Sequence, residues 1–227
     1  MLLKLSFASI ALSMVALAQN PITGDSPFQI RYAANLTSGD SVINITNSGA
    51  NGASLYGPGF GGAVGNICVN VYAFSPDEQL VSCCSCLVTP NGLVSLSVNN
   101  VMVSNTLTGV RPSSVVVKLL STLAGAGGSG TSCTNSAATV AGVAPATESA
   151  APVAGEVLAP GMRAWGTTIH AGAAAGTLAT TETAFSPATL SAGELASITN
   201  RCTNIIGNGS AFGICRSCRP GALGARN

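Results

Sequence analysis

The sequence predicts a mostly β protein, with an antiparallel β-sandwich-like body, one C-terminal α-helix and stabilising disulfide bonds. Short segments of alternating apolar and polar residues recur between turn signals, which is typical of a β-sandwich. One segment, Ser191–Gly207, combines helical periodicity with a capping sequence. All eight cysteines follow an N-terminal segment with the features of an export signal, so disulfides are expected.

The segment Asn66–Val98 organises the predicted sheet. Alternate positions of Ile67–Phe74 are small and apolar, which indicates a half-buried strand. The sequences Ser75-Pro76-Asp77-Glu78 and Thr89-Pro90-Asn91-Gly92 predict tight turns, because proline presets φ at the second position of a turn. The segment is therefore expected to form three strands joined by two turns.

Four of the cysteines lie in this segment. If Phe74 pairs with Leu80 across the first turn, Cys68 faces Cys86 at a spacing that a disulfide can use, within one register step. Cys83 and Cys84 are adjacent, so on a strand they point to opposite faces and need partners elsewhere. The full set of candidates for disulfides is Cys68, Cys83, Cys84, Cys86, Cys133, Cys202, Cys215 and Cys218. Beyond a Cys68–Cys86 pair, the sequence does not choose among their pairings.

Residues 1–18 are predicted to be a signal peptide. Lys4 precedes an apolar run that ends in the small-x-small cleavage signal Ala16-Leu17-Ala18. The run is short for a membrane helix, so no transmembrane anchor is expected. The protein is therefore expected to be secreted or extracellular, with the periplasm or the cell surface as alternatives.

The composition narrows the classes of partner. Charged residues make up only 7% of the chain, with nine Lys and Arg against eight Asp and Glu. Removal of Lys4 with the signal peptide leaves eight of each, so the mature chain is formally neutral. Nucleic-acid binding needs clustered positive charge and is not expected, whereas a neutral surface favours self-association. No other partner and no cofactor is indicated.

Three regions follow the signal peptide. Residues 19–122 are the predicted β-sandwich region, and residues 123–161 an Ala/Gly/Pro-rich loop or linker with one or two weak strands. Residues 162–227 are expected to form a β-hairpin, a helix and a Cys-rich tail that pack on the same body. Outside the central segment, strands are expected at 28–34, 41–47, 101–104, 114–120, 162–170 and 177–185, with Trp165 as a core anchor.

The predicted helix begins at a capping box, in which Ser191 caps an amide and Glu194 reaches back to the cap. Gly207 is placed to end the helix in a left-handed conformation. The residues that share its apolar face are Leu195, Ile198, Cys202 and Ile205. This face is expected to pack on the β body.

The strongest candidate for reactivity is Cys215-x-x-Cys218, because the arginines at 216 and 219 favour the thiolate that redox chemistry needs. A structural disulfide is the favoured interpretation, since redox motifs of this kind usually begin a helix and this one follows a helix. A zinc site from Cys215 and Cys218 with Cys83, Cys84 or Cys86 has suitable ligand types but irregular spacing. No metal site is assigned.

The protein is not expected to be an enzyme. His170 is the only histidine, and no G-x-S-x-G motif accompanies it. Aromatic residues, at 4%, are too few for the sugar platform of a glycosidase. The carboxylates from which a catalytic pair could be drawn are Asp77, Glu78, Glu148, Glu156, Glu182 and Glu194. No catalytic or cofactor-binding residue is assigned.

Two further features concern the surface. The glycine-rich segment Tyr56–Gly65 predicts a loop and lacks the GK[ST] sequence of a phosphate cradle. Asn35, Asn44 and Asn208 each begin an Asn-x-Ser/Thr sequence, which matters only where exported proteins are glycosylated.

The stretches NICVNVYAFSPDEQLVSCCSC (66–86) and LASITNRCTNIIGNGSAFGICRSCR (195–219) resemble secreted bacterial proteins of no assigned activity. The resemblance carries no functional residue with it. Fungal hydrophobins also have eight cysteines, but they have two doublets. The chain has only Cys83-Cys84, so it is not placed in that family.

These observations lead to three hypotheses for function. The first is a secreted structural, surface or adhesion-type protein. The second is a thiol-redox or metal-binding secreted protein that uses the C-terminal CxxC. The third is a small-ligand or carbohydrate-binding β-sandwich that uses the Tyr56–Gly65 loop and Tyr72.

Overall fold

The computed structural model describes residues 26–57, 62–125, 128–133, 140–141, 156–215 and 218–220. The predicted signal peptide, residues 1–18, lies outside these ranges. So do Glu148, part of the Tyr56–Gly65 loop and most of the predicted linker.

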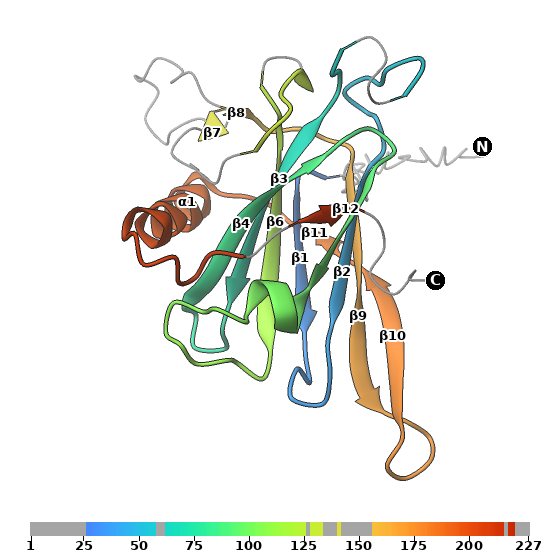
Figure 1. Ribbon diagram of the computed structural model, residues 1–227, viewed down its shortest axis with the longest axis vertical. Coiled ribbons are helices and arrows are strands. Elements are labelled where there is room, and N and C mark those ends of the chain that lie inside the picture. Colours follow the sequence, from blue (N-terminus) through green and yellow to red (C-terminus); the bar gives the residue numbers. More distant parts are fainter. Residues whose placement is uncertain are drawn as a thin grey trace, which may run out of the picture.

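Two five-stranded antiparallel sheets face each other and confirm the predicted fold class (Figure 1). Sheet A has the strand order β11-β1-β6-β3-β4, and sheet B has the order β10-β9-β2-β5-β12. The strands of sheet A are β1 (Phe28–Ala33), β3 (Ile67–Phe74), β4 (Leu80–Val88), β6 (Val115–Leu123) and β11 (Ser186–Pro187). The strands of sheet B are β2 (Val42–Asn47), β5 (Leu93–Ser97), β9 (Met162–Ala171), β10 (Leu178–Ala184) and β12 (Arg219–Pro220).

Four further elements complete the described part of the chain. A π-helical turn, η1 (Val98–Met102), follows β5, and the helix α1 (Ala192–Gly207) precedes the tail. β7 (Val140–Ala141) and β8 (Glu156–Val157) form a separate two-stranded parallel pair. No helix among the described residues is long and apolar enough to cross a membrane.

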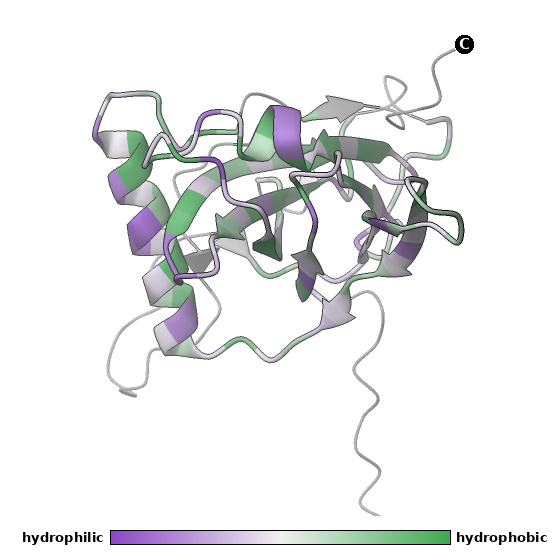
Figure 2. Ribbon diagram, turned by 90° about the horizontal axis from the view of Figure 1, so that it is seen from below, coloured by the Kyte–Doolittle hydropathy of each residue, from purple (hydrophilic) through white to green (hydrophobic). Residues whose placement is uncertain are grey.

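β3 is buried along its whole length because it is covered on both faces. Val69 and Val71 point between the two sheets, whereas Tyr72 and Phe74 point to the opposite face, under α1. Figure 2 shows α1 beside sheet A, outside the space between the sheets. The prediction of a half-buried strand is therefore wrong, because the helix converts the second face of the strand into a second core.

The predicted apolar face of α1 forms this second core. Its four residues are buried against sheet A: Leu195, Ile198, Cys202 and Ile205. Ser191 accepts a hydrogen bond from the Glu194 amide at 3.1 Å, as predicted for the cap. The Glu194 carboxylate does not reach back to the cap; it forms an ion pair with Lys118 on β6, at 2.5 Å.

The pairing of β3 with β4 contradicts the predicted Cys68–Cys86 disulfide. Phe74 faces Leu80 as expected, but the register shifts between Ala73 and Phe74. From there on, Cys68 faces Leu87 and Cys86 faces Val69. A shift of one residue turns a side chain to the other face of a strand, so Cys68 and Cys86 lie on opposite faces of sheet A.

Three smaller predictions are also corrected. The strand expected at 101–104 is absent, because η1 and the turn after it occupy these positions. Trp165 is only half-buried, and its neighbours Met162 and Ala164 supply the core contacts of β9. The left-handed residue after the helix is Gly209, with φ of 69°, because the helix continues through Gly207.

Candidate functional site

All eight cysteines form disulfides, as predicted. The bonds are Cys68–Cys133, Cys83–Cys202, Cys84–Cys215 and Cys86–Cys218. Three of the four start on β4, which makes this strand the centre of the network. The prediction that all eight cysteines form disulfides is confirmed. The disulfides join residues that are 65 to 132 positions apart in the sequence.

Neighbouring cysteines of β4 form disulfides with different parts of the chain, namely the helix and the C-terminal tail. Cys83 points out of the sandwich and bonds to Cys202 on the buried face of α1. Cys84 and Cys86 belong to the core between the sheets and bond to the tail. This arrangement confirms that adjacent cysteines on a strand need separate partners.

The tail runs along the outer edge of β4 before it reaches sheet B. The Cys83 amide donates to the Gly213 carbonyl at 2.8 Å, and the Cys215 amide donates to the Cys83 carbonyl at 3.2 Å. β12 then pairs with β5, with Arg219 opposite Ser95. The tail therefore connects an edge of sheet A to an edge of sheet B, held by two disulfides on the way.

The CxxC motif has no bond within itself. Cys215 and Cys218 bond to Cys84 and Cys86 instead, and Cys215 is only 6% exposed. A CxxC dithiol that exchanges with a substrate closes its own disulfide, so the two cysteines do not have the arrangement of such a motif.

Sulfur atoms gather where the two tail disulfides lie side by side. The Sγ atoms of Cys84, Cys86 and Cys218 lie within 4.8 Å of one another, and Cys215 is bonded to the first of them. Among the described residues, this is the one group of three or more potential metal ligands that the geometry brings together. The four residues are called the sulfur cluster below.

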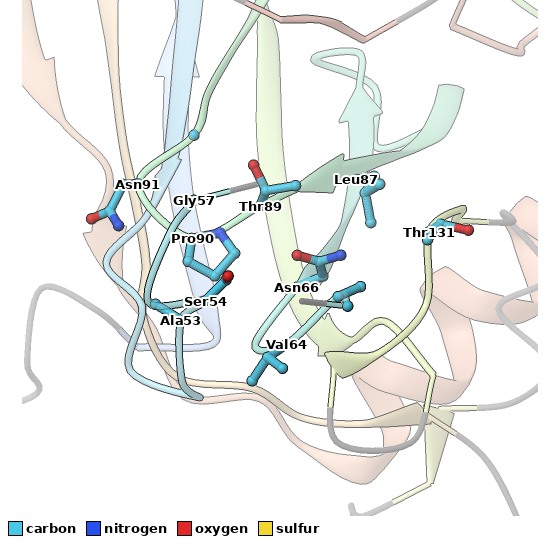
Figure 3. Close-up of a pocket in the computed structure, with 13 residues that line it drawn as sticks. Ala53, Ser54, Gly57, Val64, Asn66, Leu87, Thr89, Pro90, Asn91 and Thr131 are labelled. Atoms are coloured by element: carbon cyan, nitrogen blue, oxygen red, sulfur yellow. The ribbon is translucent and has the colours of Figure 1, made fainter. Parts of the chain in front are cut away.

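A cavity of about 590 Å³ opens at one end of the sandwich (Figure 3). Its lining comes from the segment between β2 and β3, from Leu87 near the end of β4, from the turn between β4 and β5, and from Thr131. The described residues that line it are neutral, and they include Asn66, Leu87 and Thr89. Part of the predicted Tyr56–Gly65 loop therefore borders a cavity.

The two tyrosines of the ligand-binding hypothesis do not line this cavity. Tyr72 is completely buried beneath α1, and Tyr56 is 79% exposed but outside the lining. A second cavity, of about 630 Å³, lies between the β3–β4 turn and α1. Asp77, Glu78 and Arg201 line it, and Arg201 donates to the Glu78 carbonyl at 2.9 Å.

The residues considered for catalysis are dispersed. His170 Nδ1 lies 3.1 Å from the Ala171 carbonyl oxygen. Glu194 is paired with Lys118, and Asp77 is hydrogen-bonded to Ser75 within the turn. Within the described residues, no nucleophile, base and orienting group come together.

Among the residues whose burial is described, Arg31 is the one buried charged side chain, at 6% exposure. It extends from β1 to sheet B and donates to the Thr168 and Thr183 hydroxyls at 2.7 and 3.3 Å. Burial lowers the pKa of its guanidinium, and the negative charge of Glu182 opposes that effect. This residue ties the two sheets together and has no contact with either cavity.

The three Asn-x-Ser/Thr sites differ in exposure. Asn35 and Asn208 are exposed, whereas Asn44 is half-buried on β2. The Asn35 side chain donates to the Ile169 carbonyl at 2.6 Å, and Asn44 accepts from the Ser95 hydroxyl at 2.6 Å. Asn208 accepts from the Ser210 amide and hydroxyl through its Oδ1, at 2.8 and 2.6 Å, whereas Asn35 uses its side-chain nitrogen, the atom to which a glycan is attached.

No protein-family model, no curated protein and no solved structure matches this chain. The site is therefore described from its own geometry.

Proposed function

We propose that this chain is a secreted structural, surface or adhesion-type protein. The disulfide network supports this proposal most directly. It fastens the helix and the tail to the central sheet, and disulfides of this number form and persist in oxidising compartments. A low charge and the export features of residues 1–18 are consistent with the same setting.

Export is tested by expressing the full chain in a secreting host. The mature protein is expected outside the cytoplasm, beginning at Gln19 and without free thiols. The variant Leu12→Arg, which puts a charge into the apolar run, is expected to remain inside with reduced cysteines, whereas Ser13→Ala is exported normally. Recovery of the unmodified chain inside the cell, with Met1 in place and free thiols, would overturn the proposal.

The structural role is tested by proteolysis of the exported protein with and without a reductant. Since the network holds the elements together, the oxidised protein is expected to resist protease for much longer than the reduced protein. Adhesion is measured separately, as binding of the labelled protein to cells and to glass. A protein that remains free in the medium and binds neither is not an adhesin.

A second candidate function, the binding of a small uncharged ligand or a sugar, is favoured by the neutral cavity of about 590 Å³. Asn66 and Thr89 supply polar groups and Leu87 an apolar wall. Leu87→Trp is expected to fill the cavity and abolish binding on a glycan array or in a thermal-shift screen. The control Leu178→Trp lies on exposed β10. Equal signals from both variants would remove this candidate.

A further inference from the structure

The sulfur cluster results from the spacing of its cysteines along β4 and along the tail. Cys84 and Cys86 are two residues apart on β4, so both side chains point to the same face of the strand. Cys215 and Cys218 are three residues apart on the tail, and their disulfides hold both against this face of β4. Four sulfur atoms therefore lie at one place in the core between the sheets.

The arrangement is close to what a tetrahedral zinc ion requires. Four thiolates at Zn–S distances of about 2.3 Å are separated from one another by about 3.8 Å. Three Sγ atoms of the cluster already lie within 4.8 Å of one another, and the fourth is bonded to one of them. Shifts of about 1 Å would bring these sulfur atoms to the separation found in a zinc site with four cysteine ligands.

The other two disulfides do not share this geometry. Cys83 lies on the opposite face of β4, and its partner Cys202 is on the buried face of α1. Cys68 faces Leu87 across the β3–β4 ladder and bonds to Cys133. None of these four residues belongs to the group of ligands that the geometry brings together.

We propose that the sulfur cluster is a second, reduced-state site that binds one Zn²⁺ through Cys84, Cys86, Cys215 and Cys218. The same four residues then hold the tail on β4 either by two disulfides or by one metal ion. With a phosphine as reductant, each disulfide consumes one phosphine and one water and gives two thiols and a phosphine oxide. The four thiols release four protons to solvent as the four Zn–S bonds form.

The surroundings favour a structural zinc site over a catalytic one. Cys84 and Cys215 are each 6% exposed, Cys86 is fully buried and Cys218 is partly buried. Four cysteine ligands fill a tetrahedral coordination sphere, so none of its positions is left for a water or a substrate. The Ser82 hydroxyl lies 3.3 Å from the Cys215 Sγ and is placed to donate to a thiolate there. The ion would therefore stabilise the fold before oxidation or after reduction.

The test uses the full chain, reduced with a phosphine and titrated with Zn²⁺ or with Co²⁺. One ion per chain is expected, with the visible absorption bands of tetrahedral Co²⁺–thiolate coordination. After zinc loading, alkylation and peptide mapping are expected to show protection of the four cluster cysteines and modification of the other four. Near-ultraviolet circular dichroism of the same samples reports whether the tertiary packing is retained.

Variants separate this site from nonspecific binding to an unfolded chain. Cys84→Ser/Cys86→Ser is expected to weaken Zn²⁺ binding by about 100-fold or more, because two of four ligands are lost. The matched control Cys83→Ser/Cys202→Ser removes two cysteines outside the cluster and is expected to keep the affinity. Protection spread over all eight cysteines, equal losses in both variants, or no tetrahedral thiolate signal would each overturn the proposal.

Discussion

Replacing Cys86 and Cys218 together by alanine is expected to cost less stability than replacing Cys68 and Cys133. The sequence separations suggest the opposite, since they are 132 and 65 residues. A disulfide stabilises a protein mainly by restricting the unfolded chain, and the restriction grows with the length of the loop that it closes. The length that counts is the loop that remains when the other disulfides are in place.

The connectivity makes this loop very short for Cys86–Cys218. With Cys84–Cys215 intact, the two ends are already joined through two residues of β4 and three residues of the tail. The chain-entropy relation gives about 2 kcal/mol for a loop of about five residues, against about 5 kcal/mol for 132 residues. No other disulfide shortens the Cys68–Cys133 loop, so its removal is expected to cost about 4 kcal/mol.

The assay is unfolding of both oxidised double-alanine variants in guanidinium chloride, after peptide mapping confirms the three remaining disulfides. Cys86 and Cys68 are almost equally buried, so the small cavities left by alanine largely cancel in the comparison. The Cys68/Cys133 variant is expected to be less stable by about 2 kcal/mol. If the Cys86/Cys218 variant is the less stable one, the reasoning from loop length is refuted.

Three further substitutions test the packing. Ile198→Ala, at a fully buried position of α1, is expected to lower the free energy of unfolding in urea by about 2–5 kcal/mol. The control Asn200→Ala, at an exposed position of the same helix, is expected to lower it by less than about 0.5 kcal/mol, and similar losses in both variants would contradict the second core. Lys118→Met breaks the pair with Glu194, whose two side chains are 21% and 33% exposed, so a loss of about 0.5–1 kcal/mol that shrinks in 1 M salt is expected. A loss independent of salt would contradict an ionic origin. Arg31→Met is expected to change the free energy of unfolding by less than about 1 kcal/mol, because the cost of burying the charged guanidinium offsets the gain from its hydrogen bonds. A loss above about 3 kcal/mol would show that the charge stabilises the sandwich.

Local sequence patterns predicted most of the elements because they act over a few residues. The alternation in the strands, the proline turns and the cap at Ser191 all depend on neighbours in the chain. The burial of Tyr72 and Phe74 was not predictable in the same way. It depends on a helix that comes more than 100 residues later in the chain and covers the outer face of sheet A.

The candidate site was predicted in its parts and missed in its assembly. Both C-x-C on β4 and C-x-x-C on the tail were visible, and Cys83, Cys84 and Cys86 were all considered as neighbours of the tail cysteines, but the sequence did not choose among the three and offered Cys68 as a competing partner for Cys86. The register shift between Ala73 and Phe74 determines that Cys68 and Cys86 lie on opposite faces of sheet A. No signal in the turn sequence distinguishes this register from the one in which Cys68 faces Cys86. The usable signal was the match of two same-face cysteines on β4 with two closely spaced cysteines on the tail.

Because three disulfides share one strand, the order in which the native disulfides can form during synthesis is also restricted. A chain is made from its N-terminus, so β4 exists long before the helix and the tail; Cys83 precedes its partner by 119 residues. Until then three neighbouring thiols have no native partner, whereas Cys68 can close with Cys133 much earlier. Wrong pairings formed in this interval are corrected only by thiol–disulfide exchange, on a scale of seconds to hours. A chain that stops before Cys202 leaves the three cysteines of β4 without their native partners, and three cysteines cannot all pair with one another. At least one thiol therefore remains, which distinguishes an incomplete molecule from a finished one.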